Sequence, residues 1–269
     1  MIRASRNFYG TLKVFDYSPD VPDDHYRLLM HGATTHGLQF VKPEKALLAT
    51  SYYGEHSGIG LAFLHLPRTS GRHFGLVGLG TGTVAVYGQA DDTLRIYEIN
   101  PAVEKLAHDP FTHIDRSPAK VSVVMGDARL SLEQELAAGQ PNEFDLLALD
   151  AFSSDAIPAH LLTKEAFEVY LKHLRPDGVI AVHISNRHLD LRPVVKRQAN
   201  RLGWAAVIIN DDREDEDLLY SSDWVLITSD LGALSLEPIE HASSHEFGAV
   251  ERIELWTDDR TALWRILRF

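Results

Sequence analysis

The sequence predicts an α/β protein: an N-terminal antiparallel β layer, then a Rossmann-like, mostly parallel sheet with helices on both faces. From residue 73 onward, short apolar runs alternate with segments of helical pattern, which is typical of a parallel sheet covered on both sides. Residues 1–66 instead hold β-forming runs around turns such as His31-Gly32. We therefore expect an N-terminal β-hairpin domain over residues 1–66 and a Rossmann-like domain, of the methyltransferase type, over residues 67–269.

The elements of the second domain follow from this alternation. The predicted strands are 74–79, 94–99, 121–125, 144–149, 179–184, 205–209 and 224–228, and the predicted helices are 101–108, 129–138, 163–174 and 193–202. Pro101 suits the first turn of a helix, where its missing N–H costs nothing. Pro176-Asp177-Gly178 ends a helix before the next strand. Ligands of such sheets sit beyond the carboxyl ends of the strands, so the residues that follow the strands are the candidate site.

A glycine-rich turn, Gly78-Leu79-Gly80-Thr81-Gly82, follows the first of these strands. Glycine has no side chain, so the backbone can approach a ligand closely here. Glu98 ends the next apolar run, at about the spacing expected for an acidic residue that binds a ribose. The G-x-G-x-G spacing resembles the first motif of S-adenosylmethionine-type transferases more than a dehydrogenase fingerprint, and no P-loop pattern occurs. We expect a nucleoside site here.

Three consecutive strands end in carboxylates, namely Glu98, Asp127 and Asp150, and Asp155 follows soon after. An aspartate at such a place can simply cap the next helix, as Asp127 is placed to do. A loop follows Asp150, so capping explains it less well. Carboxylates at one edge can bind a cationic amine. Such an amine is protonated at neutral pH and must lose a proton before it attacks, and a neighbouring carboxylate can take that proton.

Composition excludes several functions. The chain has 38 acidic and 26 basic side chains, a formal net charge of -12, which argues against a nucleic-acid partner. It has no cysteine, which excludes disulfides, thiolate catalysis and cysteine zinc sites, and its histidines match no metal-binding spacing, so we expect no metal. No apolar run is long enough to span a membrane and the N-terminus lacks a signal-peptide core, so the expected location is the cytoplasm.

Several short motifs occur along the chain in an order that is typical of one enzyme family. They are Tyr9-Gly10, His31-Gly32, Gln39, Tyr52-Tyr53, Phe144-Asp145-Leu146-Leu147-Ala148-Leu149-Asp150, Ser153-Ser154-Asp155, and a helix with Phe167 and Tyr170. This order resembles the polyamine aminopropyltransferases, the spermidine and spermine synthases. A second set resembles a divergent bacterial branch in which such a domain is fused to transporter helices, which this sequence lacks. That set is His36-Gly37-Leu38-Gln39, Ser51-Tyr52-Tyr53-Gly54-Glu55, His183-Ile184-Ser185-Asn186 and Trp256-Thr257-Asp258-Asp259.

The resemblance implies an activity and a set of roles. The family transfers an aminopropyl group from decarboxylated S-adenosylmethionine to an amine such as putrescine, releases methylthioadenosine, and usually forms homodimers. By position, the nucleoside would be held by Gln39, Gly78, Gly80, Thr81, Gly82, Glu98, Asp127 and Ala128. Asp150 would help to deprotonate the amine and Asp155 would anchor its far ammonium. Tyr53 and Glu55 would line the amine channel.

Two features depart from the family pattern. Thr81 stands where the synthases carry an aspartate that pairs with the donor's aminopropyl ammonium, and Ala151-Phe152 lengthens the spacing from Asp150 to Asp155. A missing carboxylate removes a charge-assisted contact, and it also removes repulsion against the carboxylate of intact S-adenosylmethionine. Three functions therefore stay open. They are aminopropyl transfer, transfer of a methyl or aminocarboxypropyl group from intact S-adenosylmethionine, and non-catalytic binding of a nucleoside or polyamine.

Overall fold

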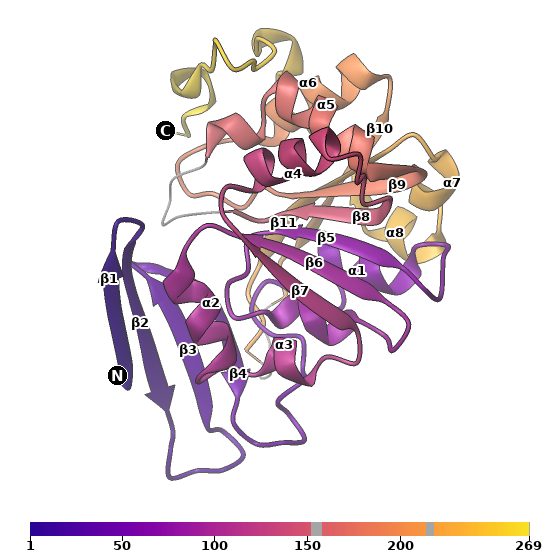
Figure 1. The fold of residues 1–269 in the computed structure, drawn as a ribbon. Coiled ribbons are helices and arrows are strands. Elements are labelled where there is room, and N and C mark those ends of the chain that lie inside the picture. Colours follow the sequence, from indigo (N-terminus) through magenta and orange to yellow (C-terminus); the bar gives the residue numbers. More distant parts are fainter. Residues whose placement is uncertain (152–157, 214–217, 269) are drawn as a thin grey trace.

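The computed structural model describes residues 1–151, 158–213 and 218–268, and contains two sheets (Figure 1). The first is antiparallel, in the order β1-β2-β3-β4. Its strands are β1 (Arg3–Asn7), β2 (Gly10–Tyr17), β3 (Tyr26–His31) and β4 (Thr34–Phe40). Two of its hairpins, β1–β2 and β3–β4, carry the turn residue Tyr9 and the strand residue His36. Both residues lie on the same side of the protein as the carboxyl ends of the strands in the second sheet.

The second sheet has the order β12-β10-β11-β9-β8-β5-β6-β7. Strands β5 to β9 pair in parallel, while β10, β11 and β12 pair antiparallel at one side. The bounds are β5 (His73–Val77), β6 (Thr93–Glu98), β7 (Lys120–Met125), β8 (Phe144–Leu149), β9 (Leu174–His183), β10 (Ala205–Asp211), β11 (Ser222–Thr228) and β12 (Ser243–Ser244). From β5 the chain continues to β6 and β7 on one side, and it then returns to β8 and β9 on the other side of β5. Ligands of such sheets bind at the point where the strand order reverses in this way. The predicted fold class is confirmed.

Helices cover both faces of this sheet, and each face has its own apolar core. One face carries α1 (Gly58–His65), α2 (Pro101–His108), α3 (His113–Arg116), α7 (Leu231–Leu234) and α8 (Glu237–Ala242), together with side chains of the N-terminal sheet. The other carries α4 (Ala128–Ala137), α5 (Lys164–His173) and α6 (Arg192–Leu202). Short 3₁₀ helices span Thr83–Tyr87, Ala159–Leu161, Val250–Arg252 and Leu263–Ile266. Of the helices described, none is long and apolar enough to cross a membrane.

Helix α1 was not predicted from the sequence, because two glycines obscure its pattern. The structure needs both of them. A Cβ on Gly58 would lie 2.4 Å from Cβ of Trp224, and a Cβ on Gly60 would lie 2.2 Å from the backbone oxygen of Gly54. The hydroxyl of Ser57 accepts a hydrogen bond from the N–H of Gly60 and caps the helix. Helix α1 packs in the core of the second sheet, and the domain boundary after residue 66 stays a prediction.

The N-terminal sheet is tied to the second sheet by close contacts near the glycine-rich turn. A Cβ on Gly37 would lie 2.3 Å from Oγ1 of Thr81, so β4 and the turn are in direct contact. Arg27 of β3 donates a hydrogen bond to the backbone oxygen of Pro110 at 2.9 Å. Because of these contacts, the N-terminal sheet forms one wall over the carboxyl ends of β5 and β6.

Candidate active site

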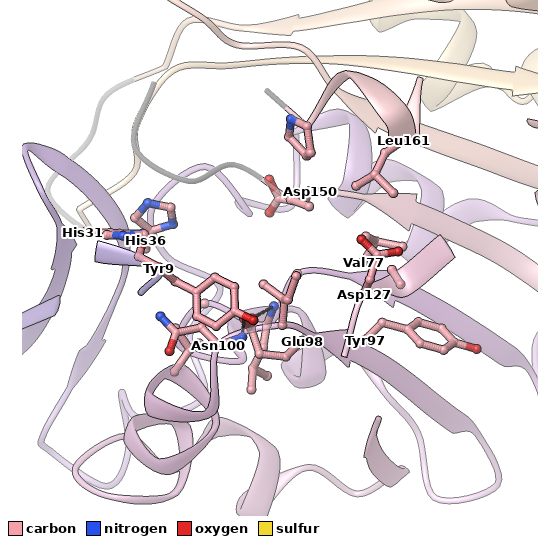
Figure 2. Close-up of a pocket in the computed structure, with 18 of the residues that line it drawn as sticks. Tyr9, His31, His36, Val77, Tyr97, Glu98, Asn100, Asp127, Asp150 and Leu161 are labelled. Carbon is pink, nitrogen blue, oxygen red and sulfur yellow. Dashed lines mark hydrogen bonds between the residues drawn. The ribbon is translucent and has the colours of Figure 1, made fainter. Parts of the chain in front are cut away.

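A cavity of about 210 Å³ lies where the carboxyl ends of β5, β6, β7 and β8 meet the N-terminal sheet. Figure 2 shows Glu98, Asp127 and Asp150 around it, with Tyr9, His31 and His36 on the side of the N-terminal sheet. Its lining is Tyr9, Leu12, Leu29, His31, His36, Val77–Gly80, Tyr97–Asn100, Val103, Gly126–Ala128, Asp150, Ala151, Pro158, His160 and Leu161. The predicted residues Gly78, Gly80, Glu98, Asp127, Ala128 and Asp150 are thus brought together.

The glycine-rich turn fits tightly between β8 and the N-terminal sheet. Gly78 has a φ of +100°, and a Cβ there would lie 2.3 Å from the backbone oxygen of Asp150. A Cβ on Gly80 would lie 2.8 Å from the backbone oxygen of His36. Only glycine allows both approaches. The turn therefore sets the distance between the end of β8 and the wall formed by the N-terminal sheet.

Thr81 and Gly82, the other predicted residues of the turn, do not line the cavity. The Thr81 side chain is buried, and its hydroxyl lies 2.8 Å from the hydroxyl of Thr83. Gly82 begins the 3₁₀ helix, and a Cβ there would lie 2.6 Å from Ile114. The turn accordingly presents its backbone, and no carboxylate, to the cavity.

Glu98 lies beneath the cavity at the end of β6. Its carboxylate accepts hydrogen bonds from the backbone N–H groups of Leu79, at 3.0 Å, and Asn100, at 2.7 Å. Burial raises the pKa of Glu98, and the backbone N–H groups oppose that rise. These bonds fix the carboxylate, and its remaining lone pairs can accept from ligand hydroxyls. The neighbouring Asn100 was not singled out from the sequence. Its Nδ2 is buried without a hydrogen-bond partner among the described residues, although the residue lines the cavity.

Asp127 caps a helix and also lines the cavity. One carboxylate oxygen accepts from the N–H of Leu130 at 3.0 Å and so caps α4. The other lies 2.9 Å from Nε2 of His160, which also lines the cavity. The helix cap positions the carboxylate at the rim, where it can accept a hydrogen bond from a ligand amino group.

Asp150 is the most constrained carboxylate of the site. Its side chain is 4% exposed. One oxygen accepts from the hydroxyl of Tyr53 at 2.5 Å, and the other lies 2.7 Å from Nδ1 of His183. Burial, together with the Asp150 charge, raises the pKa of Tyr53 well above its ordinary value, so the phenol keeps its proton and donates. Tyr53 thus holds Asp150 in place, and its predicted position along an amine channel stays a prediction.

The structure places His183, at the end of β9, beside Asp150. Its ring stacks between Tyr52, at 4.9 Å, and Trp224, at 4.6 Å. Its Nε2 lies 2.8 Å from Oγ of Ser185. Strand register could have revealed this, because Leu149 of β8 pairs with Val182 of β9 and the next residues are Asp150 and His183. When two strands pair side by side, the residues that follow the paired positions also lie next to each other.

A second cavity, of about 530 Å³, adjoins the first, and His36 lines both. Tyr52, His183 and Ser185 line it from one side, and Tyr220, Ser222 and Asp223 line it from the other. Burial, with His31 nearby, lowers the pKa of His36 to about 4, so this ring is neutral at pH 7. The Nε2 of His36 and the Oγ of Ser222 are buried and have no hydrogen-bond partner within residues 1–151, 158–213 and 218–268.

Gln39 and Glu55 are not among the residues that line the first cavity. Gln39 uses its amide on Ala46 and Thr112, to which it is bonded at 2.9 and 3.0 Å. Glu55 is exposed. Asp155 lies in 152–157, outside the described residues, so its role stays a prediction. In the part of the chain that the structure describes, no group of three or more histidines and carboxylates is placed to hold a metal ion.

No family model matches the sequence. The chain is 33% identical to the N-terminal histidine N-methyltransferase of Emericella nidulans over 121 residues, which cover 44% of this chain and 21% of that protein. It is 30% identical to the polyamine aminopropyltransferase of Vibrio vulnificus over 113 residues, which cover 40% of this chain and 36% of that protein. The chain therefore matches about a fifth of one curated relative and about a third of the other.

Spermidine synthases have the same fold. A probable spermidine synthase from Corynebacterium glutamicum superposes with a TM-score of 0.64 at 19% identity, covering 85% of this chain and 80% of that one. The enzyme from Thermotoga maritima gives a TM-score of 0.59 at 14% identity, with 96% and 81% covered. At these identities the structural likeness establishes the fold. Together with the Vibrio match, it confirms the predicted resemblance to the spermidine synthases, and the relatives found are transferases.

Proposed function

We propose that this spermidine synthase-like chain transfers an aminopropyl group from decarboxylated S-adenosylmethionine to an amine such as putrescine and releases methylthioadenosine. Asp150 carries the proposal. It is a buried carboxylate that lines the cavity ringed by strand ends, and it is held by Tyr53 and by His183, which lines the second, polar cavity. One cavity suits a nucleoside donor and the other an acceptor, and the bonded pair of Asp150 and His183 links them.

The first cavity has the groups that an adenosine moiety needs. Glu98 can accept from the ribose hydroxyls, and Asp127 can accept from the adenine amino group. The unpartnered Nδ2 of Asn100 can donate to the same ligand. Val77, Leu79 and Leu161 supply apolar surface for the base. In the proposal Gln39 supports the nucleoside wall through Thr112 rather than by direct contact.

The chemistry is a displacement at carbon. The amine nitrogen attacks the methylene carbon beside the sulfonium, a C–N bond forms, and the C–S bond breaks. Its electron pair passes to sulfur, which leaves as the neutral thioether of methylthioadenosine. The nitrogen must give up a proton, and the negative charge of Asp150 favours that loss. In this proposal Asp155 would bind the distal ammonium of the acceptor, and Glu55 would line the amine channel.

A second candidate is transfer from intact S-adenosylmethionine to an amine, and the position of Thr81 favours it. That side chain is buried against Gly37 and Thr83, so the turn offers no carboxylate to a donor ammonium and none to repel a donor carboxylate. The partial match to a histidine N-methyltransferase agrees with this second candidate. Both candidates alkylate an amine nitrogen, and both need the carboxylate at position 150.

Calorimetric titration with three ligands distinguishes the candidates. S-adenosylmethionine, its decarboxylated form and methylthioadenosine are each titrated with and without putrescine, and products of incubation with amines are identified by mass spectrometry. Tighter binding of the decarboxylated donor and release of methylthioadenosine support aminopropyl transfer. Equal or tighter binding of the intact donor, with S-adenosylhomocysteine released, supports the second candidate. Binding without any product supports a non-catalytic domain.

The proposal includes a homodimer, as the resemblance implies, in the cytoplasm, the location expected from the sequence. Sedimentation equilibrium of the purified chain tests the dimer directly. A monomer at all concentrations would remove the dimer from the proposal, and the titrations and product analysis test the chemistry separately.

A further inference from the structure

We infer that His183 accepts the proton of the acceptor amine through the hydroxyl of Ser185, while Asp150 orients the imidazole and stabilises its cation. The inference rests on the proposed function and assigns the base to a residue of the second cavity. Asp150, His183 and Ser185 form a continuous chain, with distances of 2.7 Å from Asp150 to Nδ1 and 2.8 Å from Nε2 to Oγ.

The tautomer follows from the partners. A carboxylate accepts and does not donate, so Nδ1 of His183 carries the proton that faces Asp150, and Nε2 presents its lone pair to the hydroxyl of Ser185. The same carboxylate–imidazole–hydroxyl order activates the serine of hydrolases, where the carboxylate stabilises the imidazolium and does not itself take the proton. Stacking between Tyr52 and Trp224 keeps the ring in this plane.

Asp150 is poorly placed to be the direct proton acceptor. Each of its oxygens already takes one short hydrogen bond, from Tyr53 and from His183, and the side chain is nearly fully buried. Both oxygens are therefore engaged, and Asp150 is not among the residues that line the second cavity. Its charge acts best on a neighbouring group, and His183 is the neighbour that reaches the second cavity.

Ser185 has one acceptor position left for the substrate. Its hydroxyl donates to Nε2 of His183, and its oxygen accepts the N–H of Asp223 at 2.8 Å. A hydroxyl oxygen has two lone pairs, so one remains for an ammonium N–H in the second cavity. The unpartnered atoms of His36 and Ser222 line the same cavity, together with two aspartates, Asp212 and Asp223, and two arginines, Arg187 and Arg268. An amine bound there can donate to the remaining lone pair of Ser185 and to the unpartnered acceptors beside it.

The proton balance closes within these residues. As the amine attacks, its N–H proton passes to the oxygen of Ser185, and the hydroxyl proton of Ser185 passes to Nε2 of His183. The nitrogen keeps the electron pair that becomes the C–N bond. The resulting imidazolium is paired with the Asp150 carboxylate, and it returns its proton to water after product leaves. No metal, oxidant or further reactant is needed.

The first test replaces His183 by asparagine. The amide of the new side chain can still donate to Asp150 from the Nδ1 position, but it cannot take a proton. In His183→Asn we expect the single-turnover rate, at saturating donor and amine, to fall by roughly 10²- to 10⁴-fold, with donor affinity within about threefold of wild type. In His183→Gly, added imidazole should restore part of the rate. His173→Asn is the matched control. It removes another buried histidine, bonded to the backbone oxygen of Leu132 outside both cavities, and should leave the turnover rate unchanged.

Ser185→Ala tests the link without disturbing the stacked ring. In Ser185→Ala we expect the rate to fall by about tenfold or more and the acidic side of the pH–rate profile to become flatter. Ser185→Thr should restore the rate. Among the described residues, the titratable groups around His183 include Asp150, Tyr52 and His36, so the profile is compared with that of Tyr53→Phe. Ser243→Ala, which removes a hydroxyl bonded to Ile239 outside both cavities, should change neither rate nor profile.

The outcomes separate the two proposals. If wild type releases methylthioadenosine or S-adenosylhomocysteine while His183→Asn and Ser185→Ala stay within about threefold of its rate, the role of His183 is wrong and the proposed function stands. A wild type that binds donor and alkylates no amine overturns both. If added imidazole restores the rate of His183→Gly but not that of Asp150→Asn, the result supports His183 as the proton acceptor and Asp150 as its positioning residue.

Discussion

Replacing Glu98 by glutamine should weaken nucleoside binding more than it weakens the fold. The carboxylate accepts two backbone N–H groups, from Leu79 and Asn100. Glutamine has a single acceptor oxygen, so its NH₂ must face one of these N–H groups. A buried N–H without a partner costs about 1–3 kcal/mol, and the loss of a buried charge offsets part of this. We expect the free energy of unfolding to fall by about 1–2 kcal/mol.

The effect on the ligand is larger because the hydrogen bonds to ribose lose their charge. Such charge-assisted bonds contribute about 1.5–3 kcal/mol, which corresponds to a rise in Kd of roughly 10- to 150-fold. Calorimetry with methylthioadenosine measures this value, and urea denaturation measures the stability. Both assays are run on the same preparation, so a loss of affinity is not mistaken for a loss of folded protein.

Glu135→Gln is the matched control. Glu135 of α4 also accepts several hydrogen bonds, from Arg95, Tyr97 and Asn142, but it lies outside the cavity. It should lose stability by a similar amount and keep the Kd of wild type. A folded Glu98→Gln that binds methylthioadenosine within twofold of wild type would refute the nucleoside site at this position.

Three further changes probe the framework of the site. Gly78→Ala should lower the free energy of unfolding by more than Gly139→Ala. Both glycines have positive φ, where an alanine is strained by about 1–3 kcal/mol, but only a Cβ on Gly78 would also lie 2.3 Å from a backbone oxygen. Paired urea titrations measure the difference. Asp92→Asn should cost about 3–5 kcal/mol, since Arg72 is buried against it with contacts of 2.6 to 3.3 Å, and unchanged stability would contradict this. Burial lowers the pKa of His113 to about 4. The unfolded histidine titrates near 6.5, so the unfolded state binds more protons between pH 6.5 and 4, and stability should fall by about 3 kcal/mol across that window; His113→Gln should lack this part of the slope.

The second sheet could be predicted because its signals are local. Each buried parallel strand is a continuous apolar run, and each following helix has a marked start. The predicted ranges 101–108 and 144–149 agree with α2 and β8, where Pro101 fixes the first turn and Asp150 ends the apolar run. The glycine-rich turn and Glu98 were found for the same reason, since both are recognised by their spacing along one strand–turn–strand unit.

The rest depends on contacts between distant segments. Gln39 bonds to Thr112, 73 residues away, and this pairing decides that its amide faces the wall rather than the cavity. Thr81 turns inward because β4 approaches it at Gly37. His183 joins Asp150 only through the register of β8 and β9. None of these follows from a pattern within either segment, so the roles of Gln39 and Thr81 could be placed only from the fold.

The wall that the N-terminal sheet contributes also has a consequence for synthesis on the ribosome. Phe40 ends the N-terminal sheet, and Asp150, which lines the cavity, lies 110 residues further along the chain. At 5–20 residues per second, roughly 5–20 s separate the emergence of the two. During that interval the apolar side chains of Leu12, Val14 and Leu29 lack the strands and helices that later bury them. The nascent chain must therefore avoid aggregation while the N-terminal sheet has been synthesised and the strands that complete the cavity have not yet been translated.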